Sequence, residues 1–186
     1  MFIQTEATPN PATLKFIPGK PVLPGSTREF LDHAQAEDSP LASRLFAVEG
    51  VSGVFLGHDF ITVSKTAGEW QHLKPAILGL IMDHYLSGAP IVNEGSAPDL
   101  SLSEEFFEPA DSEIVSTIKE LLDTRVRPAV AQDGGDITFK GFKEGVVYLN
   151  MKGSCAGCPS STATLKHGIE NLLRHFIPEV SEVRPV

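Results

Sequence analysis

Both cysteines of the chain, Cys155 and Cys158, lie in one short stretch, residues 153–159, with two residues between them. Residues 146–151 before this stretch place Val147, Leu149 and Met151 on one face, as a half-buried strand does. Pro159 suits the first turn of a helix, which needs no N–H there. Apolar residues then recur at helical spacing, at Leu165, Ile169, Leu172, Leu173 and Phe176. The chain is therefore expected to hold both thiols on a short loop between a strand and a helix.

Thiols at the start of a helix are expected to be acidic. The helix dipole and the unpaired N–H groups favour thiolate over thiol there, and the thiolate is the form that binds metal. A metal or cluster held by thiolates generally takes four of them, whereas one chain supplies only Cys155 and Cys158. A symmetric pair of chains would complete the set at its two-fold axis. The sequence therefore predicts a homodimer that shares a four-thiolate site near its surface, which is how a carrier would hold a cofactor that it gives up.

Other readings use the same cysteine spacing. Thioredoxin-like oxidoreductases also place a CxxC at a helix start, for thiol–disulfide exchange, but there a βαβ unit precedes it and an aromatic residue usually flanks it. Here Gly, Ser and Ala flank the cysteines. A structural zinc site across a dimer would use the same four thiolates. Burial of the cysteines as small apolar residues is a further alternative, which a glycine-rich loop at a helix start disfavours.

Composition bears on the partners and the compartment. The chain has 186 residues, is 41% hydrophobic and carries a net charge of −9. It can therefore bury real cores, but it lacks the clustered Lys and Arg that nucleic acid or an anionic membrane surface requires. No apolar run approaches the roughly 20 residues of a membrane helix, and no signal or transit layout follows Met1. We expect a reducing compartment, the bacterial cytoplasm because Met1 looks native, with a mitochondrial matrix after removal of a presequence as the alternative.

The chain divides into two parts around a polar connection. Residues 1–90 and 112–186 carry the periodic apolar patterns of helices and strands, whereas glycine, proline, serine and acidic residues interrupt residues 91–111. We expect an α+β chain, with two small α/β-sandwich-like domains over residues 1–90 and 112–186 joined by an acidic, flexible linker.

In the front domain the patterns predict two pairs of strands, over residues 1–5 and 13–16 as a hairpin and over residues 53–57 and 60–64 joined around residues 57–59. Ser39 before Pro40 indicates the start of a short helix through Phe46. The last helix is expected to begin late or kink early because of Pro75. It carries on one face Trp70, Leu73, Ile77, Leu80 and Ile81.

In the back domain a first helix, capped by Asp111 or Ser112, is expected to end near Arg127–Pro128. Its apolar face consists of Ile114, Ile118, Leu121 and Leu122. A turn at residues 133–136 then leads to a strand at residues 137–142, with Ile137 and Phe139 inward. The order continues with a turn at 143–145, the strand before the cysteines, the helix after them, and a final strand over residues 180–183.

The sequence contains no catalytic constellation. Asp133 and Asp136 could suggest paired carboxylates, but Asp-Gly-Gly-Asp is typical of a turn. His167 and His175 fall away from the apolar stripe of the last helix and are expected to face solvent. The remaining histidines lack ligand spacing; they are His33, His58, His72 and His84. Without a nucleophile elbow, a phosphate loop or a dinucleotide fingerprint, we expect a protein that is not an enzyme.

The back half resembles the NifU-like C-terminal domain of Nfu proteins. The resemblance rests on residues 127–130 (Arg-Pro-Ala-Val), 133–136 (Asp-Gly-Gly-Asp) and 153–159 (Gly-Ser-Cys-Ala-Gly-Cys-Pro). The front half resembles the Nfu N-terminal domain that often precedes it. That similarity lies in residues 8–11 (Thr-Pro-Asn-Pro) and 13–16 (Thr-Leu-Lys-Phe), and in Trp70 before residues 73–75 (Leu-Lys-Pro). The resemblance spans nearly the whole chain, and the CxxC-Pro after a paired-Gly turn in this order of elements is its most specific part.

This resemblance implies a scaffold or carrier that holds an iron–sulfur cluster between two subunits and hands it to client apoproteins. The cluster would be of the [4Fe–4S] type, with a [2Fe–2S] form as an alternative, and its ligands in this chain would be Cys155 and Cys158. The longer NifU proteins have further cysteine-bearing domains, which this sequence lacks, so assembly from free iron and sulfide is not implied. The front domain, which shows no chemistry of its own, is expected to recognise clients or the upstream assembly scaffold that donates the cluster.

Overall fold

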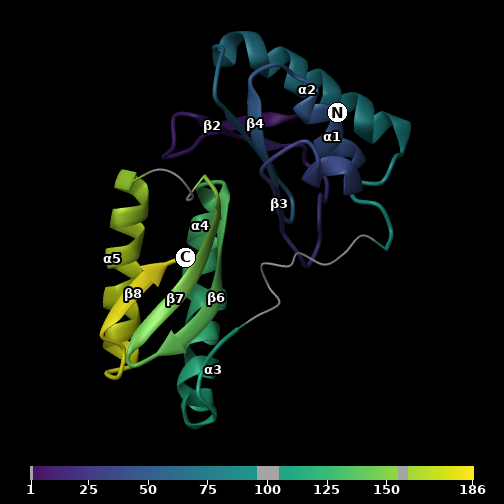
Figure 1. The fold of residues 1–186 in the computed structure, drawn as a ribbon. Coiled ribbons are helices and arrows are strands. Elements are labelled where there is room, and N and C mark those ends of the chain that lie inside the picture. Colours follow the sequence, from purple (N-terminus) through teal and green to yellow (C-terminus); the bar gives the residue numbers. More distant parts are fainter. Residues whose placement is uncertain (1, 96–104, 155–158) are drawn as a thin grey trace. The chain divides into compact units, whose positions relative to one another are not determined.

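The computed structural model describes residues 2–95, 105–154 and 159–186, apart from the side chains of residues 159–161 (Figure 1). Contacts divide the chain into two compact units, Met1–Ala97 and Pro98–Val186, each with its own hydrophobic core. Both units contain helices and a sheet, so the expected α+β class with two domains is confirmed. The predicted linker, residues 91–111, is described only at its two ends, and its boundaries stay a prediction.

The front unit contains an antiparallel sheet of five strands in the order β1-β2-β5-β4-β3. The strands are β1 Gln4–Ala7, β2 Thr13–Ile17, β3 Arg28–Phe30, β4 Val51–Leu56 and β5 Ile61–Lys65. The two predicted strand pairs, β1 with β2 and β4 with β5, are confirmed. The sequence did not indicate β3, because three residues are too few to show an alternating pattern.

Ser39 begins helix α1, Pro40–Phe46, as predicted. Its side-chain oxygen accepts a hydrogen bond from the Ala42 N–H at 3.1 Å and donates one to the Ile91 carbonyl at 2.6 Å. A 3₁₀ helix, η1 Gln35–Asp38, precedes it. The first bond caps α1, and the second holds the chain that follows the last helix of this unit.

The last helix of the front unit, α2 Trp70–Ser87, begins before Pro75. Of the two expected alternatives the late start is therefore wrong, and the early kink stays a prediction. The Glu69 carbonyl accepts hydrogen bonds from the N–H groups of His72 and Leu73, at 2.9 and 3.0 Å, which closes the first turn ahead of the proline. Pro75 then removes one intrahelical hydrogen bond. Burial of the apolar face offsets that loss, at Leu73, Ile77 and Ile81.

The first helix of the back unit continues past Pro128, so the expected end near Arg127–Pro128 is also wrong. After the 3₁₀ turn η3 Pro109–Asp111, α3 Ser112–Leu121 runs into a π-helical segment, η4 Leu122–Val126, and then into α4 Arg127–Gln132. In a regular helix the Pro128 ring would clash with a carbonyl one turn earlier. The wider π turn avoids this clash and leaves Pro128 in the first turn of α4, where proline is tolerated.

The sheet of the back unit has three strands, β6 Gly135–Lys143, β7 Val146–Gly153 and β8 Glu182–Pro185, in that order. β6 and β7 form an antiparallel hairpin, joined at Glu144 and Gly145, which both have positive φ. A register shift between Phe139 and Gly141 marks a bulge in β6. Helix α5, Pro159–Phe176, follows β7, and β8 lies parallel to β7. The predicted order of elements is thus confirmed for the described residues.

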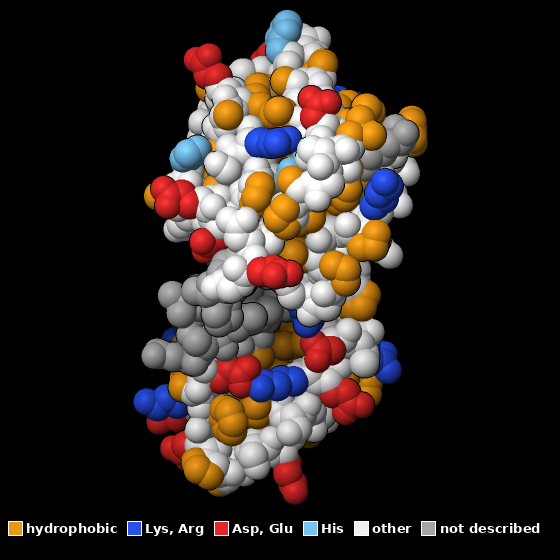
Figure 2. Space-filling view, turned by 90° about the vertical axis from the view of Figure 1, so that its right-hand side faces the viewer, with side chains coloured by type: hydrophobic (Ala, Val, Ile, Leu, Met, Phe, Trp, Pro, Cys, Tyr) orange, Lys and Arg blue, Asp and Glu red, His pale blue; other side chains and the backbone are white. Residues whose placement is uncertain are grey.

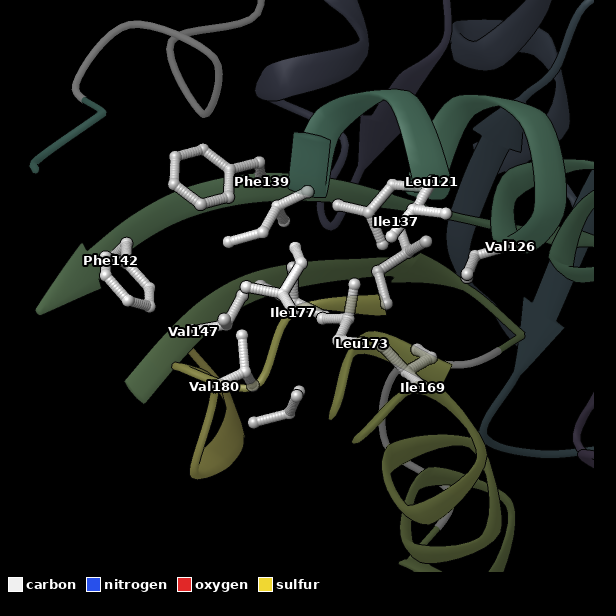
Figure 3. Packing of buried hydrophobic residues seen from close by; sticks show 14 of the residues in the cluster. Leu121, Val126, Ile137, Phe139, Phe142, Val147, Ile169, Leu173, Ile177 and Val180 are labelled. Carbon is white, nitrogen blue, oxygen red and sulfur yellow. The ribbon is translucent and has the colours of Figure 1, made fainter. Parts of the chain in front are cut away.

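One apolar cluster joins the helices and the sheet of the back unit (Figure 3). The side chains predicted to face inward contribute to it, among them Ile137, Phe139, Val147, Leu149, Met151, Ile169 and Leu173. Phe176 was also expected in this core, and that expectation is wrong, because its side chain is 47% exposed. It is the last residue of α5, and its ring lies 5.2 Å from the Arg125 guanidinium carbon.

Candidate functional site

Cys155 and Cys158, the predicted ligands, lie outside the described residues. The structure describes both ends of the segment that carries them: β7 ends at Gly153, and α5 begins at Pro159. The prediction that a strand precedes the cysteines and a helix follows them is therefore confirmed. The role of the two thiols stays a prediction.

Ser154, the last described residue before the cysteines, is tied to the turn that precedes β6. It is 1% exposed, and its N–H donates a hydrogen bond to the Gly134 carbonyl at 3.3 Å. Its hydroxyl donates a second hydrogen bond, to the Asp133 carbonyl. Gly134 has φ +81° and Gly153 has φ +69°, a region that glycine adopts without strain. The two glycines therefore allow the turn and the start of the cysteine segment to lie side by side.

An ion pair between Arg127 and Asp136 fixes this turn to α4. The Arg127 Nε and Nη2 atoms donate to the two carboxylate oxygens of Asp136 at 2.9 and 3.0 Å, and the Ile137 N–H donates to Oδ1 at 2.8 Å. The Asp136 side chain is 5% exposed, and the Arg127 side chain is 32% exposed. The hydrogen bond to Asp136 raises the pKa of Arg127 above its usual value. The bidentate contact therefore holds the carboxylate in place at the base of the cysteine segment.

Asp136 is thus not a turn residue. The turn reading is right for Asp133 and Gly134 but wrong for Asp136, which lies in β6. Sequence reasoning missed the pair because Arg127 precedes Asp136 by nine residues, across the end of a helix and a turn. It also gave no role to Lys152, which is 3% exposed and is the register partner of Asp136 on β7. A lysine beside inward-facing Met151 suggests a solvent-facing residue, and nothing in the sequence indicates its burial.

The exit from the cysteine segment is the N-terminus of an 18-residue helix. The first N–H groups of any helix have no intrahelical partner, and the dipole favours negative charge near them. Cys158 immediately precedes Pro159 in the sequence, so α5 supplies the field expected to favour thiolate there. His167 and His175 on this helix are exposed, as predicted.

Other features of the described residues add no second site. Among residues 2–95, 105–154 and 159–186, no group of three or more His, Cys, Asp or Glu side chains is arranged to hold a metal ion. On the face shown in Figure 2, Lys and Arg side chains stand apart from one another rather than forming a continuous basic area. No helix in the described part of the chain has the length and apolar character needed to span a bilayer.

Comparison with known proteins identifies two domain families. Residues 3–88 match the family model described as scaffold protein Nfu/NifU N terminal, and residues 118–184 match the NifU-like domain. A human protein named NFU1 iron-sulfur cluster scaffold homolog, mitochondrial, is 54% identical over 188 residues, covering 100% of this chain and 72% of the human protein. The protein of the same name from Drosophila sechellia is 52% identical, and the chain spans 65% of its length, just under two thirds. A NifU-like protein from Saccharomyces cerevisiae, solved in solution by NMR, is 28% identical, with a TM-score of 0.45 over 50% of this chain and 86% of that one.

Proposed function

This chain belongs to the Nfu family of NifU-like proteins, and we propose that it is an iron–sulfur cluster scaffold that carries a [4Fe–4S] cluster between two copies of itself and transfers it to apoproteins. The names of its relatives support the scaffold role. The cluster type, the dimer and the transfer are our own proposal.

One observation carries this proposal. The chain has two cysteines, both between the end of β7 and the start of α5. Two thiolates are half of the set that a [4Fe–4S] cluster takes, and a two-fold pair of chains provides four. The donor set therefore fits a cluster shared between copies better than one held by a single chain.

The anchored base of the cysteine segment supports a carrier. Ser154 and the Arg127–Asp136 pair fix where the segment begins, and α5 begins where it ends. Because each chain gives only two ligands, client thiolates would replace Cys155 and Cys158 one at a time. Transfer would then be favoured when the client site offers more ligands or better burial.

We assign recognition to the front unit. Met1–Ala97 contains no cysteine, so it adds no thiolate to the cargo site. It has its own core and a five-stranded sheet, and its proposed partners are client apoproteins and the upstream scaffold that supplies the cluster.

The names of the relatives favour the mitochondrial alternative over the bacterial cytoplasm that was expected. The two relatives described above are both named as mitochondrial proteins. We propose the matrix, in keeping with the reducing conditions that two free thiols require.

Serine substitution tests the function. Cys155→Ser and Cys158→Ser should each abolish a stable cluster after anaerobic reconstitution with iron and sulfide, and should abolish transfer to an apo-ferredoxin. His167→Ala, an exposed change on α5, serves as the control and should behave as the wild type. A protein that takes only zinc, or a monomer that reduces disulfides without metal, would replace this function with one of the two alternatives.

A further inference from the structure

Residues just before α3 add a short piece of strand to the free edge of β6. Phe106 forms an isolated parallel bridge with Gly141. Its N–H donates to the Lys140 carbonyl at 3.1 Å, and its carbonyl accepts from the Phe142 N–H at 2.8 Å. β7 lies on the other side of β6, so this segment covers the outer edge of the sheet at Gly141.

The side chains of this segment alternate between two sets of contacts, as those of a strand do. Phe106 packs against Tyr148, with ring centroids 5.1 Å apart. Glu105 forms an ion pair with Lys119 of α3, and the Phe107 ring lies 6.5 Å from that of Phe139. Each of the three side chains therefore contacts a different residue: Glu105 contacts Lys119, Phe106 contacts Tyr148, and Phe107 contacts Phe139.

The ring of Phe106, the central residue of this segment, lies over Gly141. A Cβ atom at this position would lie 2.5 Å from two atoms of the Phe106 ring, which is closer than real contacts allow. Tyr148 is the register partner of Gly141 on β7, so the glycine forms the floor and the tyrosine one wall of a seat for an aromatic side chain. The bulge in β6 falls at this point, which is where edge strands commonly change their pairing.

Lys119 and Phe139 extend the surface beyond the bridge. The Lys119 ammonium lies 5.6 Å from the Phe139 ring centroid, so the cation and the ring face the same space. A pocket of about 180 Å³ opens there, with Glu105, Lys119, Leu122 and Phe139 among its lining residues. The segment leaves this pocket unfilled.

The contact made in cis is marginal. Its backbone part consists of two hydrogen bonds, each worth about 1 kcal/mol net, and the Glu105–Lys119 ion pair and the two ring contacts add to it. Both rings nevertheless remain substantially exposed, at 42% for Phe106 and 39% for Phe107. Because so little of this segment is buried, we expect it to open more readily than the core of the unit.

We propose that the free edge of β6, with Lys119, Phe139, Gly141 and Tyr148, is a docking surface for an extended acidic–aromatic segment of a partner protein, which Glu105–Phe107 occupies in cis. The partner would add a strand to the sheet edge, with an acid facing Lys119 and an aromatic ring over Gly141. The cis segment acts as a competitor, so a partner binds only when it pairs better than Glu105–Phe107 does. None of these four residues belongs to the cysteine segment, although the pocket beside Lys119 is also lined by Arg127.

The test uses the full apo chain and a fluorescent peptide with the sequence of residues 103–109. Phe106→Ala removes the cis ring while leaving the surface intact, and should bind the peptide at least about tenfold more tightly than the wild type does. Adding Gly141→Ala to that variant should remove the binding, because the new Cβ fills the seat. Phe176→Ala, which removes an exposed ring elsewhere in the same unit, should bind as weakly as the wild type.

A charge exchange keeps the proposal testable if Gly141→Ala disturbs the sheet. Lys119→Glu in the Phe106→Ala chain should lose the peptide, and a peptide with lysine in place of Glu105 should regain it. The proposal is overturned if Phe106→Ala binds no more tightly than the wild type, or if neither Gly141→Ala nor the charge exchange alters binding.

Discussion

Arg127 at the start of α4 and Asp136 near the start of β6 are joined through both carboxylate oxygens, at 2.9 and 3.0 Å. The pair connects α4, the last part of the helical stretch that begins with α3, to the strand whose first residue, Gly135, is the register partner of Gly153. Gly153 and Ser154 lead directly into the cysteine segment. The ion pair therefore connects helix α4 and strand β6 of the back unit to the segment that would bind the cluster.

Replacing Arg127 by glutamine should destabilise the back unit and loosen its hold on a cluster. The substitution removes both hydrogen bonds that Arg127 donates to the buried Asp136 carboxylate, which should cost about 2–3 kcal/mol of unfolding free energy. The figure is at the lower end for a buried pair because Arg127 is a third exposed. Urea unfolding followed by circular dichroism measures the change in unfolding free energy. The rate at which the cluster absorbance decays after reconstitution measures how firmly the cluster is bound.

Arg125→Gln is the matched control for this change. Arg125 lies two residues earlier on the same helical stretch and is exposed, with a cation–π contact to Phe176. It should change the unfolding free energy by less than about 0.5 kcal/mol. Equal losses for the two variants would mean that the Arg127–Asp136 pair has no special part in the stability of this unit.

The front unit should lose stability when the solution is acidified, because of His84. This residue of α2 is 0% exposed, and neither ring nitrogen has a hydrogen bond of acceptable geometry to a described residue. Burial lowers the pKa of His84, and the positive charge of Arg44 lowers it further, against a small opposing effect of the backbone at Pro90 and Ala89. A histidine whose folded pKa is lowered favours folding fully above its unfolded value of about 6.5, and that contribution is lost as the pH falls below this value.

The stability of the front unit can be followed by the fluorescence of Trp70, the single tryptophan of the chain. The urea midpoint should fall between pH 7 and pH 5 in the wild type, and much less in His84→Phe, which has no proton to gain. His72→Phe changes an exposed histidine on the same helix and should keep the wild-type dependence. An identical pH dependence of the urea midpoint in His84→Phe and the wild type would show that His84 is not the cause of the loss of stability in acid.

Each unit should fold alone, and only the back unit should take a cluster. Met1–Ala97 and Pro98–Val186 have separate cores, and both cysteines belong to the second. Anaerobic reconstitution of the two units, expressed separately, should give a visible iron–sulfur absorbance for Pro98–Val186 and none for Met1–Ala97. A back unit that folds but takes a cluster only when the front unit is added would place part of the cargo site in the front unit.

Local patterns predicted most of the elements. The alternation of Val147, Leu149 and Met151 predicted β7, and Ser39 before Pro40 predicted the cap of α1. The errors arose where burial or a longer-range contact overrode a local rule: Pro75 is tolerated because the apolar face of α2 is buried, and Pro128 because a π turn precedes it. At the candidate site, the apolar patterns on either side of the two cysteines predicted the strand before them and the helix after them. They could not predict the Arg127–Asp136 pair or the burial of Lys152, because both depend on how separate elements meet.

The most direct test of the central claim is the iron and acid-labile sulfide content per chain of anaerobically reconstituted protein, measured together with its mass in solution. The account predicts one [4Fe–4S] cluster per two chains, about two irons and two sulfides per chain, in a particle of twice the 20.0 kDa of one chain. A monomer that holds a complete cluster, or a dimer that stays colourless under iron and sulfide, would contradict it.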